Sequence, residues 1–150
     1  MDLRQTFDDL VRLETEIWNS VDRRLVQECG VTLGTFNALL IVASTPGCRV
    51  NDLAAALAIT VGGISQAVDR IEARGLLARV PNPANRRSSL LEVTAEGRAA
   101  LKSASVVFDD ELEQIFGDPL SGADRERLSR GLSALRAAVA VRRTGPLTTP

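Results

Sequence analysis

Residues 60–75 read TVGGISQAVDRIEARG, and this segment predicts one helix with two different faces. Thr60 suits the N-cap position, because its hydroxyl can accept a hydrogen bond from a free amide of the first turn. Gly75 suits the end of the helix, because glycine readily adopts the left-handed conformation found there. An apolar stripe, which must face a core, recurs at helical spacing. Its members are Ile64, Val68 and Ile71.

The opposite face of this helix combines small groups, hydrogen-bonding groups and a cation. A helix in the major groove of DNA needs little bulk at its start, donors and acceptors for base edges, and a guanidinium for guanine or phosphate. Gly62 and Gly63 would each cost about 1 kcal/mol relative to alanine in an ordinary helix, and close approach to another backbone would explain them. A polar face turned to solvent is the alternative interpretation. The face consists of Val61, Gly62, Ser65, Gln66, Asp69 and Arg70.

The residues before this helix predict a helix-turn-helix arrangement. A short helix is expected from Val50 to Leu57, and a turn of three or four residues leads from it to Thr60. Residues 32–44 are apolar nearly all round, so we expect them to form the buried central helix of the domain.

The residues after Gly75 predict a β-hairpin, or wing. Two strand-like segments, 76–80 and 90–93, enclose a loop that is rich in proline, asparagine, serine and arginine. Arg86 and Arg87 would lie at the tip of the hairpin, within reach of a narrow A·T-rich minor groove, which attracts arginine. A solvated surface loop is the alternative for this pair of arginines.

Long helices are expected at both ends of the chain. The first covers residues 2–28, another begins after Thr94 and ends at Asp118, and the last follows Ser121. These helices carry more apolar surface than one small domain would bury, which favours a homodimer over a self-contained monomer. The apolar stripes of the first and last helices are Phe7, Leu10, Val11, Trp18, Val21 and Leu25, and Leu128, Leu132, Leu135 and Val139.

Composition excludes several classes of function. The chain has no histidine, no tyrosine, no metal-ligand cluster and no phosphate-binding loop, so the sequence predicts neither an enzyme nor a cofactor or metal site. No apolar run is long enough to span a membrane, and the start does not resemble a signal peptide, so we expect a cytoplasmic protein. Cys29 and Cys48 are then expected as thiols rather than a disulfide. The net charge is only −1, but residues 49–98 hold seven arginines against five acidic residues.

These residues, in this order, resemble the MarR family of winged helix-turn-helix transcription regulators. The most specific matches are Ser65-Gln66, Asp69-Arg70-Ile71-Glu72, Arg74-Gly75-Leu76 and Arg86-Arg87-Ser88. The resemblance implies a mainly α fold with a small β-hairpin wing (α+β). It implies a DNA-binding domain over 31–98, a helical dimerisation region over 1–30 and 99–143, and a flexible tail over 144–150.

The resemblance also implies a function and a set of site residues. It implies a homodimeric repressor on the double-stranded DNA of a palindromic operator, with half-sites about 10 bp apart. It implies DNA contacts for Ser65, Gln66, Arg70, Arg74, Arg86, Arg87, Arg49 and Gly62, and positioning roles for Asp69, which pairs with a wing arginine, and Asn85. Asn85 stands where the family usually has aspartate, which implies a less firmly held wing. The family often responds to small aromatic anions, for which Trp18, Phe36 and Phe108 are the candidate residues. A winged-helix module that binds protein rather than DNA is the alternative function.

Overall fold

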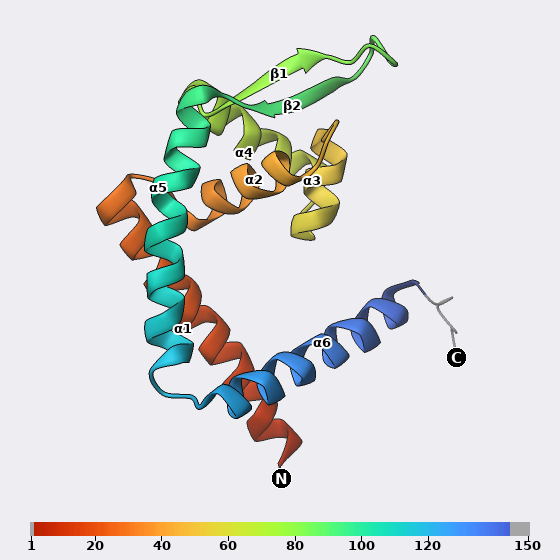
Figure 1. The fold of residues 1–150 in the computed structure, drawn as a ribbon. Helices are drawn as coiled ribbons and strands as arrows, with labels where there is room; N and C mark the ends of the chain where they lie inside the picture. The colour runs from red at the N-terminus through yellow and green to blue at the C-terminus, as the bar shows by residue number, and fades with distance from the viewer. Residues whose placement is uncertain (1, 145–150) are drawn as a thin grey trace. The chain divides into compact units, whose positions relative to one another are not determined.

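The computed structural model describes residues 2–144, with side chains as far as residue 142 (Figure 1). The chain divides into two compact units, and the boundary falls between Glu111 and Leu112. Apart from Thr144, the tail expected over 144–150 lies outside the described residues.

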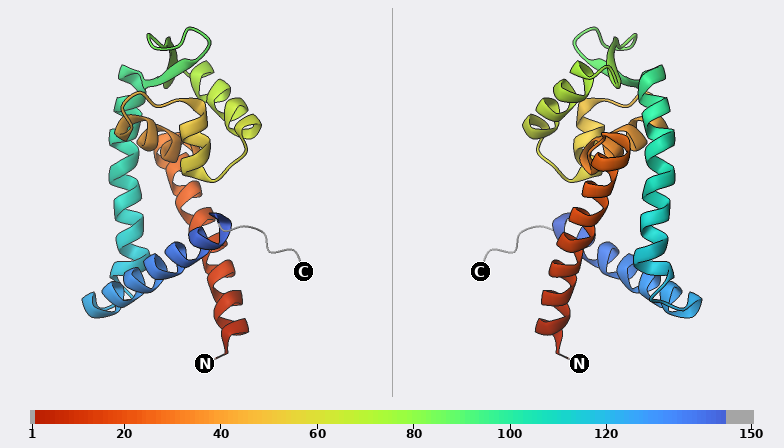
Figure 2. Two further views of the ribbon diagram at one scale, coloured as in Figure 1. Left: turned by 90° about the vertical axis from the view of Figure 1, so that its right-hand side faces the viewer. Right: turned by 90° about the vertical axis from the view of Figure 1, so that its left-hand side faces the viewer.

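The first unit is mainly helical, with one antiparallel hairpin. Figures 1 and 2 show the hairpin projecting beyond α2, α3 and α4 at one end of this unit. This arrangement confirms the expected fold class, a winged helix-turn-helix. Its elements are α1 (Leu3–Cys29), α2 (Leu33–Ser44), α3 (Val50–Leu57), α4 (Val61–Ala73), β1 (Leu77–Pro81), β2 (Ser89–Val93) and α5 (Ala95–Leu112).

Three threonines begin helices in the predicted way. The hydroxyl of Thr32 accepts a hydrogen bond from the amide of Thr35 at 3.1 Å, Thr60 accepts one from Gly63 at 3.2 Å, and Thr94 accepts one from Gly97 at 2.9 Å. Each hydroxyl satisfies one amide that has no partner inside its helix. The starts of α2, α4 and α5 are therefore specified locally.

The centre of the first unit is α2, as its all-round apolar character predicted. Phe36, Ala38, Leu39 and Val42 of α2 are buried. The apolar stripe of α4 is buried against the same core. The hairpin is attached to this core as well, because the amide of Leu91 in β2 donates to the carbonyl of Cys48 at 2.7 Å.

Both cysteines are free thiols, as predicted. Cys48 is fully buried, and burial together with the nearby Asp52 carboxylate raises the pKa of its thiol. A raised pKa lowers the fraction of reactive thiolate at neutral pH.

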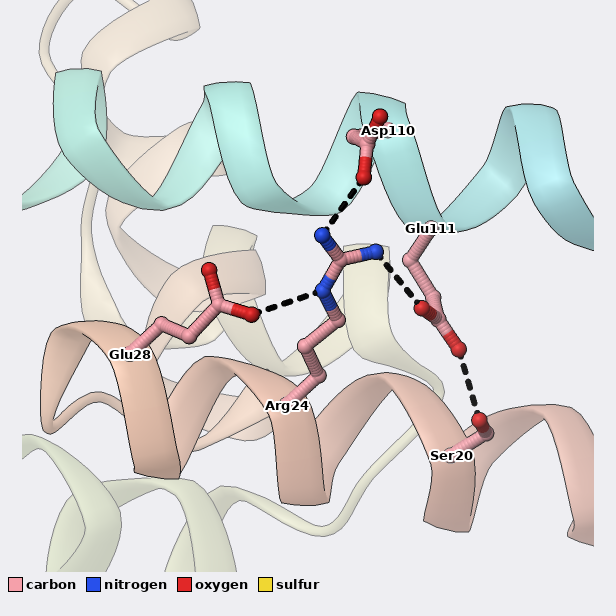
Figure 3. A network of polar contacts seen from close by, with 5 residues as sticks. All are labelled: Ser20, Arg24, Glu28, Asp110 and Glu111. Carbon is pink, nitrogen blue, oxygen red and sulfur yellow. Dashed lines mark hydrogen bonds and ion pairs between the residues drawn. The ribbon is translucent and has the colours of Figure 1, made fainter.

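A cluster of charged groups joins α1 to α5 (Figure 3). The Arg24 guanidinium donates to Glu111 at 2.8 Å, to Glu28 at 2.9 Å and to Asp110 at 2.5 Å. These hydrogen bonds raise the pKa of Arg24. Glu111 also accepts a hydrogen bond from the Ser20 hydroxyl, and this contact and Arg24 lower the pKa of its carboxyl. Both partners therefore stay charged across the physiological pH range.

The apolar stripe predicted for α1 is only partly buried within this chain. Only Val21 and Leu25 of its predicted apolar stripe are buried in this chain, whereas Phe7 is 69% exposed and Trp18 is 44% exposed. The stripe is present, but the first unit alone covers only its C-terminal part. Within residues 2–144 no single helix is long and apolar enough to cross a membrane, and α1 and α2 would qualify only as a pair bent by 83°.

The second unit holds a π-helical turn, η1 (Glu113–Gly117), and the long helix α6 (Gly122–Thr144). The Ser121 hydroxyl accepts a hydrogen bond from the amide of Asp124 at 3.2 Å, so this serine begins α6 as predicted. The predicted stripe of α6 is exposed in this chain. Its members are Leu128, Leu132, Leu135 and Val139.

A tight backbone contact joins the end of α4 to the start of α5. The Thr94 amide donates to the Leu76 carbonyl at 3.2 Å, and the Thr94 hydroxyl donates to the Gly75 carbonyl at 2.6 Å. A Cβ atom on Gly97 would lie 2.0 Å from the Leu76 carbonyl oxygen and 2.8 Å from a methyl group of Val93. Only glycine fits at position 97, because the nearest obstacle is backbone.

We expect Gly97→Ala to lower the free energy of unfolding by about 1–3 kcal/mol, the usual cost of overpacking a well-packed site. Urea unfolding followed by circular dichroism measures this. Gly34→Ala is the matched control, because a Cβ atom there meets nothing within 4 Å and alanine favours helix. Equal stability of the two variants would contradict the assigned contact.

Candidate nucleic-acid interface

The second helix of the helix-turn-helix, α4, presents a polar outer face beside the hairpin. Ile64, Val68 and Ile71 hold its inner side in the core. The predicted outer residues are arranged as the helical period requires, with Gly62, Gln66, Asp69 and Arg70 exposed and Ser65 half-buried.

Some polar groups of α4 are used to hold the hairpin. The guanidinium of Arg79, in β1, forms an ion pair with Asp69 at 2.6 Å and a second, shorter one with Glu72. The backbone amide of Arg79 also donates to Glu72 at 3.0 Å. Partial burial opposes the charge on Arg79, but the hydrogen bonds with both carboxylates outweigh it and raise its pKa. The ion pair predicted between Asp69 and a wing arginine is therefore present.

Sequence reasoning did not assign Glu72 and Arg79 to the site. The available signal was the spacing, since Arg79 lies in the strand that follows α4, ten residues after Asp69 and seven after Glu72. These spacings become contacts only because the hairpin leaves α4 in a direction that brings Arg79 beside the two carboxylates.

Side-chain amides order the loop of the hairpin. The Asn85 side-chain oxygen accepts a hydrogen bond from the amide of Arg87 at 3.0 Å, and the side chain of Asn82 donates to the Ser88 hydroxyl at 2.9 Å. Asn85 thus positions the loop through its neutral oxygen, in the manner of an Asx turn. Arg86 and Arg87 are exposed, and their guanidinium groups have no hydrogen-bond or ion-pair partner within the described residues.

The remaining three candidate arginines differ in what they contact. Arg49 forms an ion pair with Asp52 at 3.0 Å, and its amide donates to the same carboxylate at the start of α3. Arg74 donates to the carbonyl of Gly30 at 2.7 Å, so it braces the end of α1 and not the wing. In the part of the chain with described side chains, Arg70 has no polar partner.

A pocket of about 440 Å³ lies within the first unit, beside α4, where Ile64, Ala67 and Ile71 contribute to its lining. Trp18 of α1 lines it, as do Arg70 and Arg74, and most of its exposed lining is apolar. Phe36 and Phe108, the other two candidate ligand-binding residues, do not line this pocket. Their rings pack on each other at a centroid distance of 4.8 Å, and Phe36 is 2% exposed.

The chain is similar to known transcription regulators. Residues 30–88 match the model of the MarR family. A Thauera aromatica protein described as a regulatory protein for the hcr operon is 32% identical over 99 residues, which cover 66% of this chain and 59% of that protein. The chain thus spans less than two thirds of the length of this relative. None of the matched proteins named here is an enzyme, in agreement with the sequence prediction.

Solved structures extend the comparison to the fold. Sco3205, a MarR family regulator from Streptomyces coelicolor in complex with DNA, has a TM-score of 0.83 at 23% identity, covering 90% of this chain and 86% of its own. The repressor CouR bound to a 23-mer DNA duplex has a TM-score of 0.73 at 27% identity, covering 85% and 89%. CouR from Rhodococcus jostii RHA1 bound to p-coumaroyl-CoA has a TM-score of 0.73 at 22% identity, covering 84% and 87%.

We expect Arg79→Gln to loosen the hairpin, because Asp69 and Glu72 would lose their shared cation and repel each other. Amide hydrogen exchange should accelerate across residues 77–93, with a loss of about 1 kcal/mol in global stability for a partly exposed pair. Arg12→Gln is the control, since it removes an exposed ion pair with Asp8 on α1. Unchanged exchange in the hairpin of the Arg79 variant would refute the anchoring role.

Proposed function

Because this chain belongs to the MarR family, we propose that it is a sequence-specific DNA-binding transcriptional regulator, a cytoplasmic homodimer that represses from a palindromic operator. We assign the DNA-binding domain to residues 31–98 and the dimerisation region to residues 1–30 and 99–143. A small aromatic anion is the proposed releasing ligand.

One observation carries the DNA-binding proposal: four exposed polar side chains without a polar partner lie on two adjacent elements. Gln66 and Arg70 on α4, and Arg86 and Arg87 in the hairpin loop, are exposed and have no side-chain polar partner within the described residues. Their neighbours Asp69 and Arg79 satisfy each other, so they hold the hairpin beside α4. A helix and an arginine-bearing loop at this spacing fit a major groove and the adjacent minor groove.

The charge distribution supports this orientation. A net charge of −1 gives no general attraction to DNA, so binding must depend on local cations. Arg79 pairs with both Asp69 and Glu72 and offsets one of their two negative charges near the approach of a phosphate backbone. The roles of Arg49 and Arg74 are then indirect: Arg49 begins α3, and Arg74 ties α4 to the end of α1.

Exposed apolar surface supports the dimer. Phe7 and Leu3 of α1 are 69% and 73% exposed, and Leu135 and Val139 of α6 are each 57% exposed. Large apolar side chains in contiguous helical stripes mark surfaces that another chain covers. A second copy of the same chain satisfies both stripes and matches the two-fold symmetry of a palindromic operator.

The pocket supports a ligand response. Trp18 supplies a flat apolar surface, and Arg70 and Arg74 supply positive charge, which together suit an aromatic anion. Arg70 also belongs to the outer face of α4. A bound anion would compete with DNA for that guanidinium, which gives a direct route from ligand binding to release. The structure of CouR with p-coumaroyl-CoA supports the choice of ligand class for testing.

We expect Arg87→Ala to weaken binding to a duplex selected by the wild-type protein by about 1 kcal/mol or more, because one minor-groove or phosphate contact is lost. Fluorescence anisotropy at two salt concentrations measures affinity and salt dependence. Arg12→Ala on α1 is the matched control. Unchanged affinity would contradict the wing assignment, and absence of any DNA binding at low salt would favour the protein-binding alternative.

We expect p-coumaroyl-CoA or benzoate to change the fluorescence of Trp18, the only tryptophan, saturably and to lower DNA affinity over the same concentration range. Arg70→Gln should weaken ligand binding, which isothermal titration calorimetry measures, because the pocket loses a cation. A saturable fluorescence change without any loss of DNA affinity would count against the proposed competition for Arg70.

A further inference from the structure

We propose that Gln66 reads an adenine in the major groove of the operator, and that Gly62 leaves the space through which the base edge reaches it. This inference rests on the proposed DNA-binding function and adds the base that α4 recognises.

The side chain of Gln66 makes no polar contact within the described residues, whereas Asp69, Glu72 and Arg74 each make one. Asp69 and Glu72 hold Arg79, and Arg74 holds the carbonyl of Gly30. Gln66 is exposed, and its side chain makes no hydrogen bond within the described residues. Both the donor and the acceptor of its side-chain amide are therefore available to a ligand. The Arg79 ion pairs that attach the hairpin to α4 do not involve them.

Gly62 is a glycine that the fold itself does not require. A Cβ atom there would meet nothing within 4 Å, and the backbone is not in the left-handed region that favours glycine. Gly63 differs, because a Cβ atom there would lie 3.2 Å from the Thr60 hydroxyl that caps the helix. The cap therefore accounts for Gly63, whereas Gly62 costs up to about 1 kcal/mol of helix stability with no packing reason among residues 2–144. Close approach of a ligand supplies the reason.

Helix geometry joins the two residues. Positions 62 and 66 are four apart and share one face, and a helical side chain leans toward the N-terminus over the preceding turn. The amide of Gln66 therefore extends over the turn that contains Gly62, where no side chain crowds it. A base edge can reach the amide there without displacing protein atoms.

The amide selects among the bases by its donor and acceptor pattern. Adenine shows a ring-nitrogen acceptor (N7) beside an amino donor (N6) in the major groove, and one glutamine amide satisfies both. Guanine shows two acceptors, cytosine a donor, and thymine an acceptor and a methyl group. Only adenine offers both halves of the complementary pair at one base.

The test couples one protein group to one base atom. A duplex selected from a random pool by the full-length wild-type protein is prepared with 7-deazaadenine in place of one half-site adenine at a time, which removes only the N7 acceptor. At one adenine we expect the wild-type affinity to fall about tenfold, within the range for a bidentate contact. Gln66→Ala should bind the unmodified duplex at least as weakly as the wild-type protein binds the modified one. Modification of that adenine should then change the affinity of the variant less than twofold.

Gln27→Ala is the matched control, since Gln27 is an exposed glutamine on α1. It should retain wild-type affinity and the full loss on modification. Equal losses for wild type and Gln66→Ala at every adenine would overturn the proposal, as would a wild-type protein indifferent to 7-deazaadenine at all positions. If the wild-type protein selects no sequence from the pool, the proposed function fails instead, so the two failures are distinguishable.

Discussion

The close contact between Gly97 and the Leu76 carbonyl determines how α4 and the hairpin, the proposed DNA-facing elements, are held together. It closes the hairpin at its base, because the chain leaves α4 at Gly75 and returns to the same point at Thr94. The direction of the hairpin from α4 follows from this closure. Arg79 in β1 then lies beside the two carboxylates of α4, and the pairing ties the hairpin to the helix.

The polar side chains of α4 and the hairpin fall into two sets, those with a polar partner and those without one. Asp69, Glu72 and Arg79 satisfy one another, while Arg86, Arg87 and others on the same side have no polar partner within the described residues. A protein with almost no net charge attracts a polyanion through local cations. Arg79 offsets one of the two negative charges of Asp69 and Glu72 and ties the hairpin to α4 at the same time.

The pocket and the proposed DNA-facing surface have Arg70 in common, and Trp18 reaches the same pocket from α1. The Arg24 cluster holds α1 against α5 within the first unit (Figure 3). A movement of α1 or α5 can therefore reach the pocket, because the Arg24 cluster joins the two helices and Trp18 of α1 lines the pocket. Coupling of this kind needs a ligand whose interactions differ between the DNA-bound and free states. Competition for one guanidinium provides such a difference.

The sequence by itself determined the elements. Caps at Thr32, Thr60 and Thr94 and the apolar period of α4 act within a few residues, so a linear pattern records them. The family resemblance also predicted that Asp69 pairs with an arginine of the hairpin, and Arg79 is that arginine.

Only the tertiary structure decided which groups are committed to the fold. Whether an arginine is free depends on carboxylates or carbonyls that the fold brings close, as Gly30 is brought to Arg74 across 44 positions. The same holds for aromatic residues: the sequence offers Phe36 and Phe108 as ligand-binding candidates, yet their rings pack on each other between α2 and α5, and Phe36 is buried. Such contacts join residues that are far apart in the sequence, so a pattern within a short stretch of sequence does not reveal them.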